Sequence, residues 1–407
     1  MWLGYDVVLA LLFMATAADI PFRWGVSPLA WAVIYAAATL RFLSVWPGFF
    51  RLLARNWVYL LYPAVCLVSL LWSAARGATL VGGIQIAMTI CLACYLGWRF
   101  APRQLLILAF VTLMIGTTGS ILNFSLGLFG GANFSAVGGL TGIYANKNTL
   151  GHTALMLMLL ATTLLLMPAG AAPRPTRWLA PAAIVMGAVA VVMSRSMTSV
   201  VLMPLYLGLL MLLNRRRLPG WMRHLAVVAA VLTLALAPLA LSLAGIDPMA
   251  ALLDATGKDA TLTGRTDLWA IAAGEIARVP MTGHGFGAFW AAPQFESQRF
   301  EVLRAGATSA SFHNVIADVA VGTGLPGLVA ILALIVTTLR RVARNWRMDG
   351  GPLAAGLLVS VLLPLNLALA EPYLYRQHEF MLSWLVMLGI SLAPRRPKPP
   401  QRGQERP

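Results

Sequence analysis

The sequence predicts an all-α polytopic membrane protein with about twelve transmembrane helices and one large loop on its outer side. Hydrophobic residues make up 59% of its 407 residues and charged residues only 11%, whereas a soluble globular domain carries about 25% charged residues. Apolar runs of about 20 residues recur along the chain, and each is long enough as a helix to cross about 30 Å of hydrocarbon. This composition excludes a soluble cytosolic or secreted enzyme.

Apolar runs that end at charged or turn residues give twelve candidate spans. They cover residues 2–18, 26–43, 57–74, 80–98, 104–122, 149–168, 178–193, 198–213, 224–245, 313–338, 353–370 and 378–393. The chain therefore divides into nine spans in residues 1–245, a loop at 246–312, three spans in residues 313–393, and a basic tail at 394–407 that we expect to be disordered. Cys66, Cys91 and Cys94 fall inside spans, where packing is a better interpretation than zinc binding or a disulfide.

Basic residues are unevenly distributed between the two sides of the predicted helices. The formal net charge is +16, which in a soluble chain would suggest a nucleic-acid partner. If both termini are cytoplasmic, 20 of the 30 lysines and arginines lie on the cytoplasmic side, as the positive-inside rule predicts. The surplus charge then serves membrane topology and contact with lipid headgroups, and we expect membrane lipids rather than nucleic acid as partners.

The loop at 246–312 is unusual in its length and composition. Its 67 residues hold five basic and seven acidic residues, and a structureless loop of that length is uncommon unless it has a function. Thr266 is a candidate cap for an amphipathic helix from Asp267 to about Val279, which Pro280 ends. We therefore expect short helices and functional residues in this loop.

A first polar cluster, Asn146, Lys147 and Asn148, opens the sixth span. Asn148 and His152 lie four residues apart and share one face of that helix. The three residues of the cluster are candidates for substrate binding at the outer surface. The alternative is structural: Asn148 or Thr149 caps the helix, and Lys147 extends its ammonium group to the interface.

Two arginines are predicted on the outer side. Arg195 occupies a short turn between spans seven and eight, and Arg265 precedes the amphipathic helix of the loop. An arginine among hydroxyl and amide donors matches a phosphate group. The donors near Arg195 are Ser194, Ser196, Thr198 and Ser199, and those near Arg265 are Thr263 and Gly264. As structural alternatives, Arg195 extends to the membrane interface and Arg265 forms a salt bridge with Asp267.

His313 and Asn314 lie where the large loop returns to the membrane at the tenth span. Asn314 and Asp318 share a face of the predicted helix, whereas His313 lies about 140° around it from Asp318. An imidazole with an unperturbed pKa near 6.5 suits a base at the outer surface. The alternative is that His313, as a lone histidine, is a hydrogen-bonded interface residue. Arg376 is a further candidate for substrate binding.

Three glycines, Gly283, Gly285 and Gly287, alternate in the loop. They lack the G-x-G-x-x-G spacing and follow no predicted strand, so a nucleotide-binding loop is excluded. We expect them to permit tight turns, with His284 between them as a candidate for contact with an acceptor substrate.

Five motifs occur in a fixed order between about residues 140 and 330. They are G-x-Y-A-N-K-N-x-L-G at 142–151, S-R-S-x-T at 194–198, G-R-T-x-L-W at 264–269, G-x-G-F-G-x-F at 283–289, and H-N at 313–314 with Gly324 eleven residues after His313. With a large outer loop between spans nine and ten, this order resembles the bacterial O-antigen ligase and O-antigen polymerase superfamily. The first 120 residues match only as apolar spans.

The resemblance implies a metal-independent, inverting glycosyltransferase without a cofactor in the bacterial inner membrane, with a periplasmic site. It implies a glycan donor linked to undecaprenyl diphosphate and, for a ligase, a lipid A core hydroxyl as acceptor. In a polymerase the acceptor is another lipid-linked repeat unit. The resemblance also assigns His313 as the base and Arg195 and Arg265 to the diphosphate. Neither arginine has the leucine or valine four residues later that the ligase pattern requires.

The chemistry of these residues agrees with that resemblance. A diphosphate leaving group needs stabilisation of its negative charge rather than a proton, and arginines supply that stabilisation. An O-antigen ligase is therefore the leading hypothesis, with an O-antigen or exopolysaccharide polymerase as the alternative. A lipid-linked glycan transporter, from another functional class, would have charges from several helices at the midplane. We place only one acidic residue, Asp318, well inside a span.

Overall fold

The structure is a computed structural model, and it describes residues 2–20, 25–128, 134–135, 138–217, 265–296, 299, 311–369, 371, 373–376 and 378–394. These residues form helices and connecting turns, with an isolated bridge between Phe134 and Leu140. The predicted span at 224–245, about half of the predicted loop and the tail after residue 394 lie outside the described residues.

The helices follow the predicted apolar runs. In chain order they are α1 (Trp2–Ala17), α2 (Ser27–Ser44), α3 (Trp46–Arg55), α4 (Val58–Val68), α5 (Arg76–Arg99), α6 (Pro102–Leu126), α7 (Lys147–Leu166), α8 (Arg174–Ser194), α9 (Met197–Leu213), α12 (Arg265–Arg278), α14 (Val315–Asp349), α15 (Pro352–Leu367) and α16 (Phe380–Ser391). Short 3-10 turns are η2 (Ser69–Leu71), η3 (Arg215–Arg217), η4 (Ala288–Trp290) and η5 (Pro293–Phe295). The all-helical class is confirmed for the described part of the chain.

Helix length and composition identify five or six candidate membrane spans among the described residues. Of the described helices, α5, α6, α7, α8 and α14 are long and apolar enough to cross a membrane, and α2 with α3 makes a sixth candidate if that bent pair is one span. Five other apolar segments are shorter, namely α1, α9, α15, α16, and α4 together with η2. The chain is therefore a multi-pass membrane protein, and the number twelve stays a prediction.

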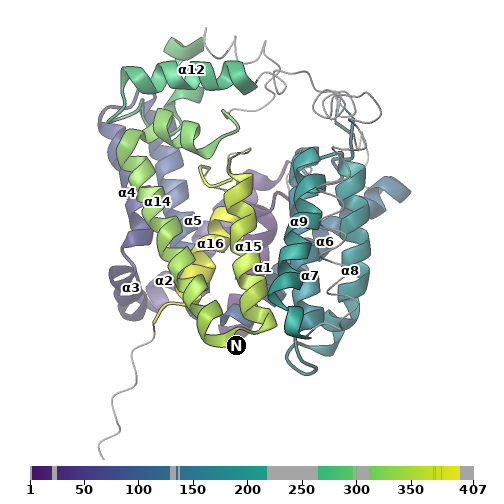
Figure 1. The fold of residues 1–407 in the computed structure, drawn as a ribbon. Helices are drawn as coiled ribbons and strands as arrows, with labels where there is room; N and C mark the ends of the chain where they lie inside the picture. Colours follow the sequence, from purple (N-terminus) through teal and green to yellow (C-terminus); the bar gives the residue numbers. More distant parts are fainter. Residues whose placement is uncertain are drawn as a thin grey trace, which may run out of the picture.

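Short connections make neighbouring helices antiparallel. Only two residues separate α5 from α6, α8 from α9 and α14 from α15, and the two helices of each pair run in opposite directions through the bundle (Figure 1). In Figure 1, α12 lies across the end of the bundle that is opposite the N-terminus. We call this the α12 end. The last residues of α8 and α15 and the first residues of α7, α9, α14 and α16 meet there.

Helix α3 is an element that the sequence reading left in a connection. It follows α2 after one residue and is bent by 99° from it. Phe49 is buried in the core, whereas Trp46 and Phe50 are more than half exposed and Arg51 and Arg55 lie in the same short helix. Ten residues with a proline at the second position do not make a span, so the apolar pattern alone could not identify it.

A buried ion-pair network ties α1, α2 and α5 together near the end opposite α12. The fully buried Asp6 carboxylate accepts hydrogen bonds from Arg41 Nε at 2.9 Å, Arg99 Nε at 2.5 Å and the Tyr95 hydroxyl at 2.6 Å. Three donors satisfy a charge that would otherwise be costly to bury. Asp318 is therefore not the only acidic residue deep within a helix, and the Asp6 network is structural in character.

Helix α14 is interrupted at Gly324. The glycine has φ 64° and ψ −160° within an otherwise continuous helix, and this conformation is nearly restricted to glycine. A Cβ atom at this position would lie 2.6 Å from the backbone carbonyl carbon of Met281. Another residue at position 324 would therefore both strain the backbone and displace the segment that packs against it.

The segment at residues 280–287 docks on that interruption through the backbone. Leu325 N donates to Pro280 O at 3.0 Å, His284 N donates to Val321 O at 2.9 Å, and Gly285 N donates to Gly322 O at 2.9 Å. Gly283, Gly285 and Gly287 all have positive φ, so the expected tight turns are present. These turns anchor the segment that follows α12 to the first half of α14.

Candidate functional site

His313 lies in a tightly held turn, residues 311–314, directly before α14. Its backbone has φ 52°, an uncommon conformation for a residue with a side chain. The buried carboxylate of Asp318 accepts hydrogen bonds from the Ser311 hydroxyl at 2.9 Å and from Phe312 N at 3.0 Å, and the Ser311 oxygen accepts one from His313 N at 2.9 Å. Asp318 therefore holds the backbone that presents His313.

A carboxylate that sequence reasoning missed connects His313 to α7. Glu371 Oε2 lies 3.0 Å from His313 Nδ1, and Glu371 Oε1 accepts a hydrogen bond from Asn148 Nδ2 at 2.9 Å. Glu371 is 7% exposed and His313 is partly buried. The predicted residues His313 and Asn148, 165 positions apart, are thus joined by one side chain. The available signal was an acidic residue directly after an apolar run, at the outer end of a predicted span.

The connection between α15 and α16 forms further hydrogen bonds, including one to α7 and one to the segment that follows α12. The Tyr373 hydroxyl is hydrogen-bonded to Nδ1 of the buried His152 in α7, and the rings are 5.2 Å apart. The Tyr375 hydroxyl accepts a hydrogen bond from Gly287 N at 3.1 Å. This connection therefore joins α7, the His313 turn and the segment that follows α12.

Lys147 and Arg195 lie along one strip of backbone at the α12 end. Leu140 N donates to Met193 O at 2.8 Å, which fixes the preceding glycines against the end of α8. A Cβ atom on Gly138 would lie 3.4 Å from Arg195 Nη1, and a Cβ atom on Gly139 would lie 3.0 Å from Lys147 Cδ. The two cations therefore border the same strip, and Lys147 is the chain neighbour of Asn148.

The hydroxyl groups around Arg195 are used within the turn itself. Ser194 Oγ donates to Val191 O at 2.7 Å and accepts from Ser196 N at 3.2 Å, and Ser199 Oγ donates to Ser196 Oγ at 3.2 Å. All three serines are buried, whereas Arg195 is exposed with φ 50°. The guanidinium group, rather than the serines, is therefore the part of this motif that is presented to a ligand.

Both asparagine motifs supply helix caps. Asn146 Oδ1 accepts a hydrogen bond from Thr149 N at 2.9 Å, and Asn314 Oδ1 accepts one from Ile316 N at 2.9 Å. The cap of α7 is thus Asn146 and not Asn148 or Thr149, which leaves the Asn148 amide to contact Glu371. Substrate binding by Asn146 and Asn314 stays a prediction.

Arg265 is the first residue of α12, and its side chain lies outside the described part of the structure. The proposed anion site and the alternative salt bridge with Asp267 are therefore both untested. One turn later in α12, Trp269 Nε1 donates to Phe312 O at 3.1 Å. Residues four apart share a helix face, so this bond tethers the Arg265 face of α12 to the residue before His313.

His284 belongs to a different cluster. Its Nε2 lies 3.0 Å from Glu275 Oε2 without the alignment of a hydrogen bond, and its ring packs on Phe295 at 4.7 Å. Burial lowers the pKa of His284, and the Glu275 charge opposes that shift. The structure places His284 against α12 and does not bring it into the Glu371 cluster.

Arg376 lies near the turn that follows α1. Burial raises the pKa of Asp19 to about 6, and the positive charge of Arg376 opposes this rise. Arg376 is half-buried, and it belongs to the same connection between α15 and α16 as Glu371. Its predicted contact with substrate is not tested by this arrangement.

Comparison with known proteins places these residues in a family. Residues 182–332 match a family model described as O-Antigen ligase, a range that includes Arg195, Arg265 and His313. The chain is also 30% identical over 293 residues to "Exopolysaccharide production protein ExoQ" of Rhizobium meliloti (strain 1021), and this match covers 69% of the chain and 63% of that protein. The chain thus spans less than two thirds of that relative's length. The domain at residues 182–332 and this relative together support membership of the chain in the O-antigen ligase-like superfamily.

Proposed function

We propose that this chain is a membrane glycosyltransferase that transfers a glycan from undecaprenyl diphosphate to a sugar hydroxyl at the α12 end, which faces the periplasm. The observation that carries the proposal is the Glu371 bridge between His313 and Asn148, beside the cations Lys147 and Arg195. Displacement of a diphosphate by an alcohol requires a base for the hydroxyl proton and, next to it, a site that stabilises the departing anion.

In the proposed reaction, the acceptor oxygen bonds to the anomeric carbon of the donor glycan as the bond from that carbon to the phosphate oxygen breaks. The electron pair leaves with undecaprenyl diphosphate, and the hydroxyl proton passes to His313. A single direct displacement inverts the anomeric centre. Arg195, Lys147 and Arg265 stabilise the charge that grows on the departing diphosphate, as arginine forks do for phosphates.

Glu371 positions the base in this mechanism. With His313 Nδ1–H donating to Glu371 Oε2, the basic nitrogen is Nε2, because one ring nitrogen of a neutral imidazole carries the proton and the other accepts. The carboxylate also stabilises the imidazolium that forms when the hydroxyl proton arrives. Asn148 donates to the second carboxylate oxygen and so fixes the plane of the carboxylate.

The acceptor is the part of the proposal on which two candidates differ. The description of the matching family model favours a ligase, in which lipid A core oligosaccharide accepts the glycan. The name of the relative, an exopolysaccharide production protein, favours a polymerase, in which a second lipid-linked repeat unit is the acceptor. Both candidates use the same donor, base and anion site.

The deciding experiment uses the purified full chain in lipid nanodiscs with a fluorescent glycan on undecaprenyl diphosphate. One arm adds lipopolysaccharide that ends at the core, and the other arm adds only more lipid-linked units. A labelled core product identifies a ligase, and longer lipid-linked chains identify a polymerase. Donor that crosses the bilayer of a proteoliposome without forming a new glycosidic bond in either arm would contradict the proposal and support a transporter.

A further inference from the structure

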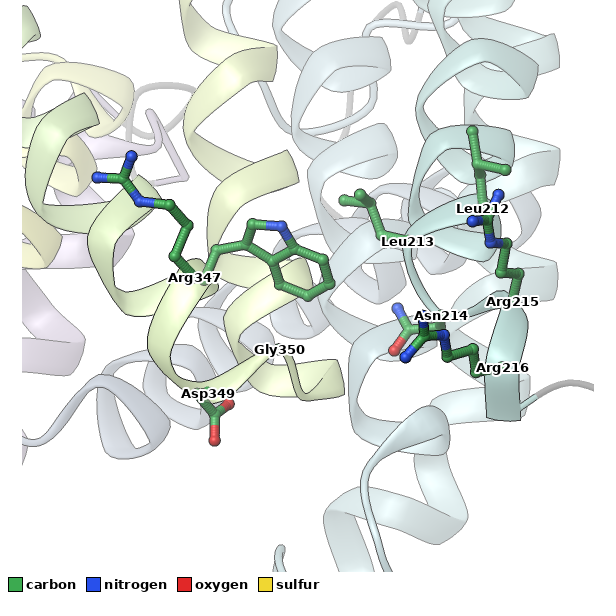
Figure 2. Close-up of a pocket in the computed structure, with 9 residues that line it drawn as sticks. Leu212, Leu213, Asn214, Arg215, Arg216, Arg347, Asp349 and Gly350 are labelled. Carbon is green, nitrogen blue, oxygen red and sulfur yellow. The ribbon is translucent and has the colours of Figure 1, made fainter.

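A cavity lies at the end of the bundle opposite His313. It has a volume of about 720 Å³ and lies between the end of α9 with η3 and the end of α14 (Figure 2). Its lining includes Leu212, Leu213, Arg215, Arg216, Trp346 and Arg347. Helix α14 is 35 residues long, so about 50 Å of helix separates this cavity from the His313 turn.

The three arginines of this cavity differ from other arginines at the same end. Arg341 donates to Gly389 O at 2.8 Å, Arg344 to Leu392 O at 3.3 Å and Arg177 to Met167 O at 2.6 Å, so these residues satisfy backbone carbonyls. Within the described part of the chain, no hydrogen bond or ion pair engages the cavity arginines, and all three are exposed. They are Arg215, Arg216 and Arg347.

A structural explanation accounts for only part of this arrangement. Arginines near the last turn of a helix offset the negative end of the helix dipole, and α9 and α14 both end here. That effect accounts for positive charge at each helix end, but a capping arginine donates to a carbonyl, as Arg341 and Arg344 do. It does not account for three uncommitted guanidinium groups around a cavity with a single acidic residue, Asp349.

The composition of the lining indicates the ligand. Guanidinium groups bind phosphate oxygens in pairs, while Leu212 and Leu213 lie on one wall of the cavity (Figure 2) and Trp346 belongs to its lining. Tryptophan and arginine together are typical of the headgroup level of a membrane, and basic pockets between transmembrane helices take anionic headgroups. We infer that this cavity binds the phosphate of an anionic phospholipid, with the upper part of an acyl chain against the leucines.

The test compares two charge-matched triple variants of the full chain. The cavity variant is R215Q/R216Q/R347Q, and the control is R55Q/R103Q/R174Q, which removes three exposed arginines elsewhere at the same end. Delipidated protein is titrated with phosphatidylglycerol in detergent, and the rise in apparent Tm gives the half-saturating lipid concentration. We expect the same half-saturating lipid concentration for wild type and the control variant. For the cavity variant we expect that concentration to be higher by at least about tenfold.

Further arms identify the source of the phosphate. We expect zwitterionic phosphatidylethanolamine and inorganic phosphate to leave the apparent Tm of wild type almost unchanged. Equal stabilisation by either probe, or a cavity variant that responds to phosphatidylglycerol as the control does, overturns the inference. The single variant R347Q, which alters an exposed residue only, should show part of the loss and serves if the triple variant is poorly expressed. None of these measurements depends on glycan transfer.

Discussion

At the scale of single residues, the candidate site depends on how one imidazole is held. Asp318 fixes the backbone of the His313 turn, and Glu371 contacts the ring at Nδ1. Sequence reasoning identified His313 and Asn148 separately because each opens a predicted span. It missed Glu371, because the contact joins elements that are distant in the chain and only the packing of α7, α14 and α15 brings them together.

We predict that E371Q lowers kcat by about tenfold to a hundredfold and leaves the KM for the lipid-linked donor nearly unchanged. The amide keeps the shape of the side chain but cannot stabilise an imidazolium by charge. Steady-state kinetics in nanodiscs measures both constants. The control is E296Q, which alters an exposed glutamate at the α12 end. A kcat for E371Q equal to that of E296Q would remove the positioning role from Glu371.

Asp19 gives a prediction for pH. Because burial raises its pKa to about 6 from 3.8, the folded state binds more protons than the unfolded state between these values, and stability falls as pH rises through that window. The effect is at most about 3 kcal/mol at neutral pH. D19N, which suits the positive φ of this residue, should remove that part of the pH dependence. The measurement is the apparent Tm of wild type and D19N from pH 4 to 7. A difference in apparent Tm between the two proteins that stays constant over this range would contradict the prediction.

At the scale of elements, α12 is attached to the site by a few specific contacts. Its core, around Leu268, Phe289 and Phe312, is separate from the core of the main bundle. The glycine segment after α12 docks on the interruption of α14, and Trp269 bonds to the His313 turn. These contacts attach α12, whose first residue is Arg265, to the turn that presents His313, although the two residues are 48 positions apart in the sequence.

We predict that W269F weakens donor binding about fivefold, because it removes one hydrogen bond while it keeps an aromatic ring. Binding of undecaprenyl diphosphate to the protein in nanodiscs provides the measurement. If Trp269 acts by holding the start of α12, the effect should largely vanish in an R265A background, since coupled residues are not additive. W290F, which alters another ring packed on Phe312, is the control. Fully additive losses would contradict the tether.

Apolar periodicity predicted most elements but not their interruptions. Within the described part of the chain, ten predicted spans match helices to within a few residues, with α4 and η2 taken together. The tenth predicted span is the exception, because α14 continues to Asp349, eleven residues past the predicted end at 338. The amphipathic helix of the loop was expected at 267–279, and α12 ends at Arg278. The helix α3 was not predicted because it is short. The tenth span was predicted as continuous through Gly324 because an interruption does not change the apolar pattern. The conformation of Gly324 is set by the docked segment, which is a tertiary effect.

At the scale of the whole molecule, the two ends of the bundle carry different chemistry. The α12 end holds His313, Glu371, Lys147 and Arg195, and the opposite end holds the arginine-lined cavity and the Asp6 network. The excess of basic residues at the opposite end predicts that this end is cytoplasmic. The donor diphosphate would then be cleaved on the periplasmic side.

Cysteine labelling tests this orientation. After the three native cysteines are replaced, A145C places an exposed thiol at the α12 end and M348C places one at the opposite end, where Met348 is 80% exposed. In cells with a permeable outer membrane, a membrane-impermeant maleimide should label A145C at once and M348C only after lysis. The reverse pattern would place the candidate site in the cytoplasm.

The most direct measurement of the account as a whole is glycan transfer by purified wild type and H313A, with donor binding measured on the same samples. If His313 is the base, H313A should bind undecaprenyl diphosphate as wild type does, because the cations are intact. Its rate should fall by about a hundredfold to ten-thousandfold. A transfer rate for H313A close to that of wild type would contradict the account.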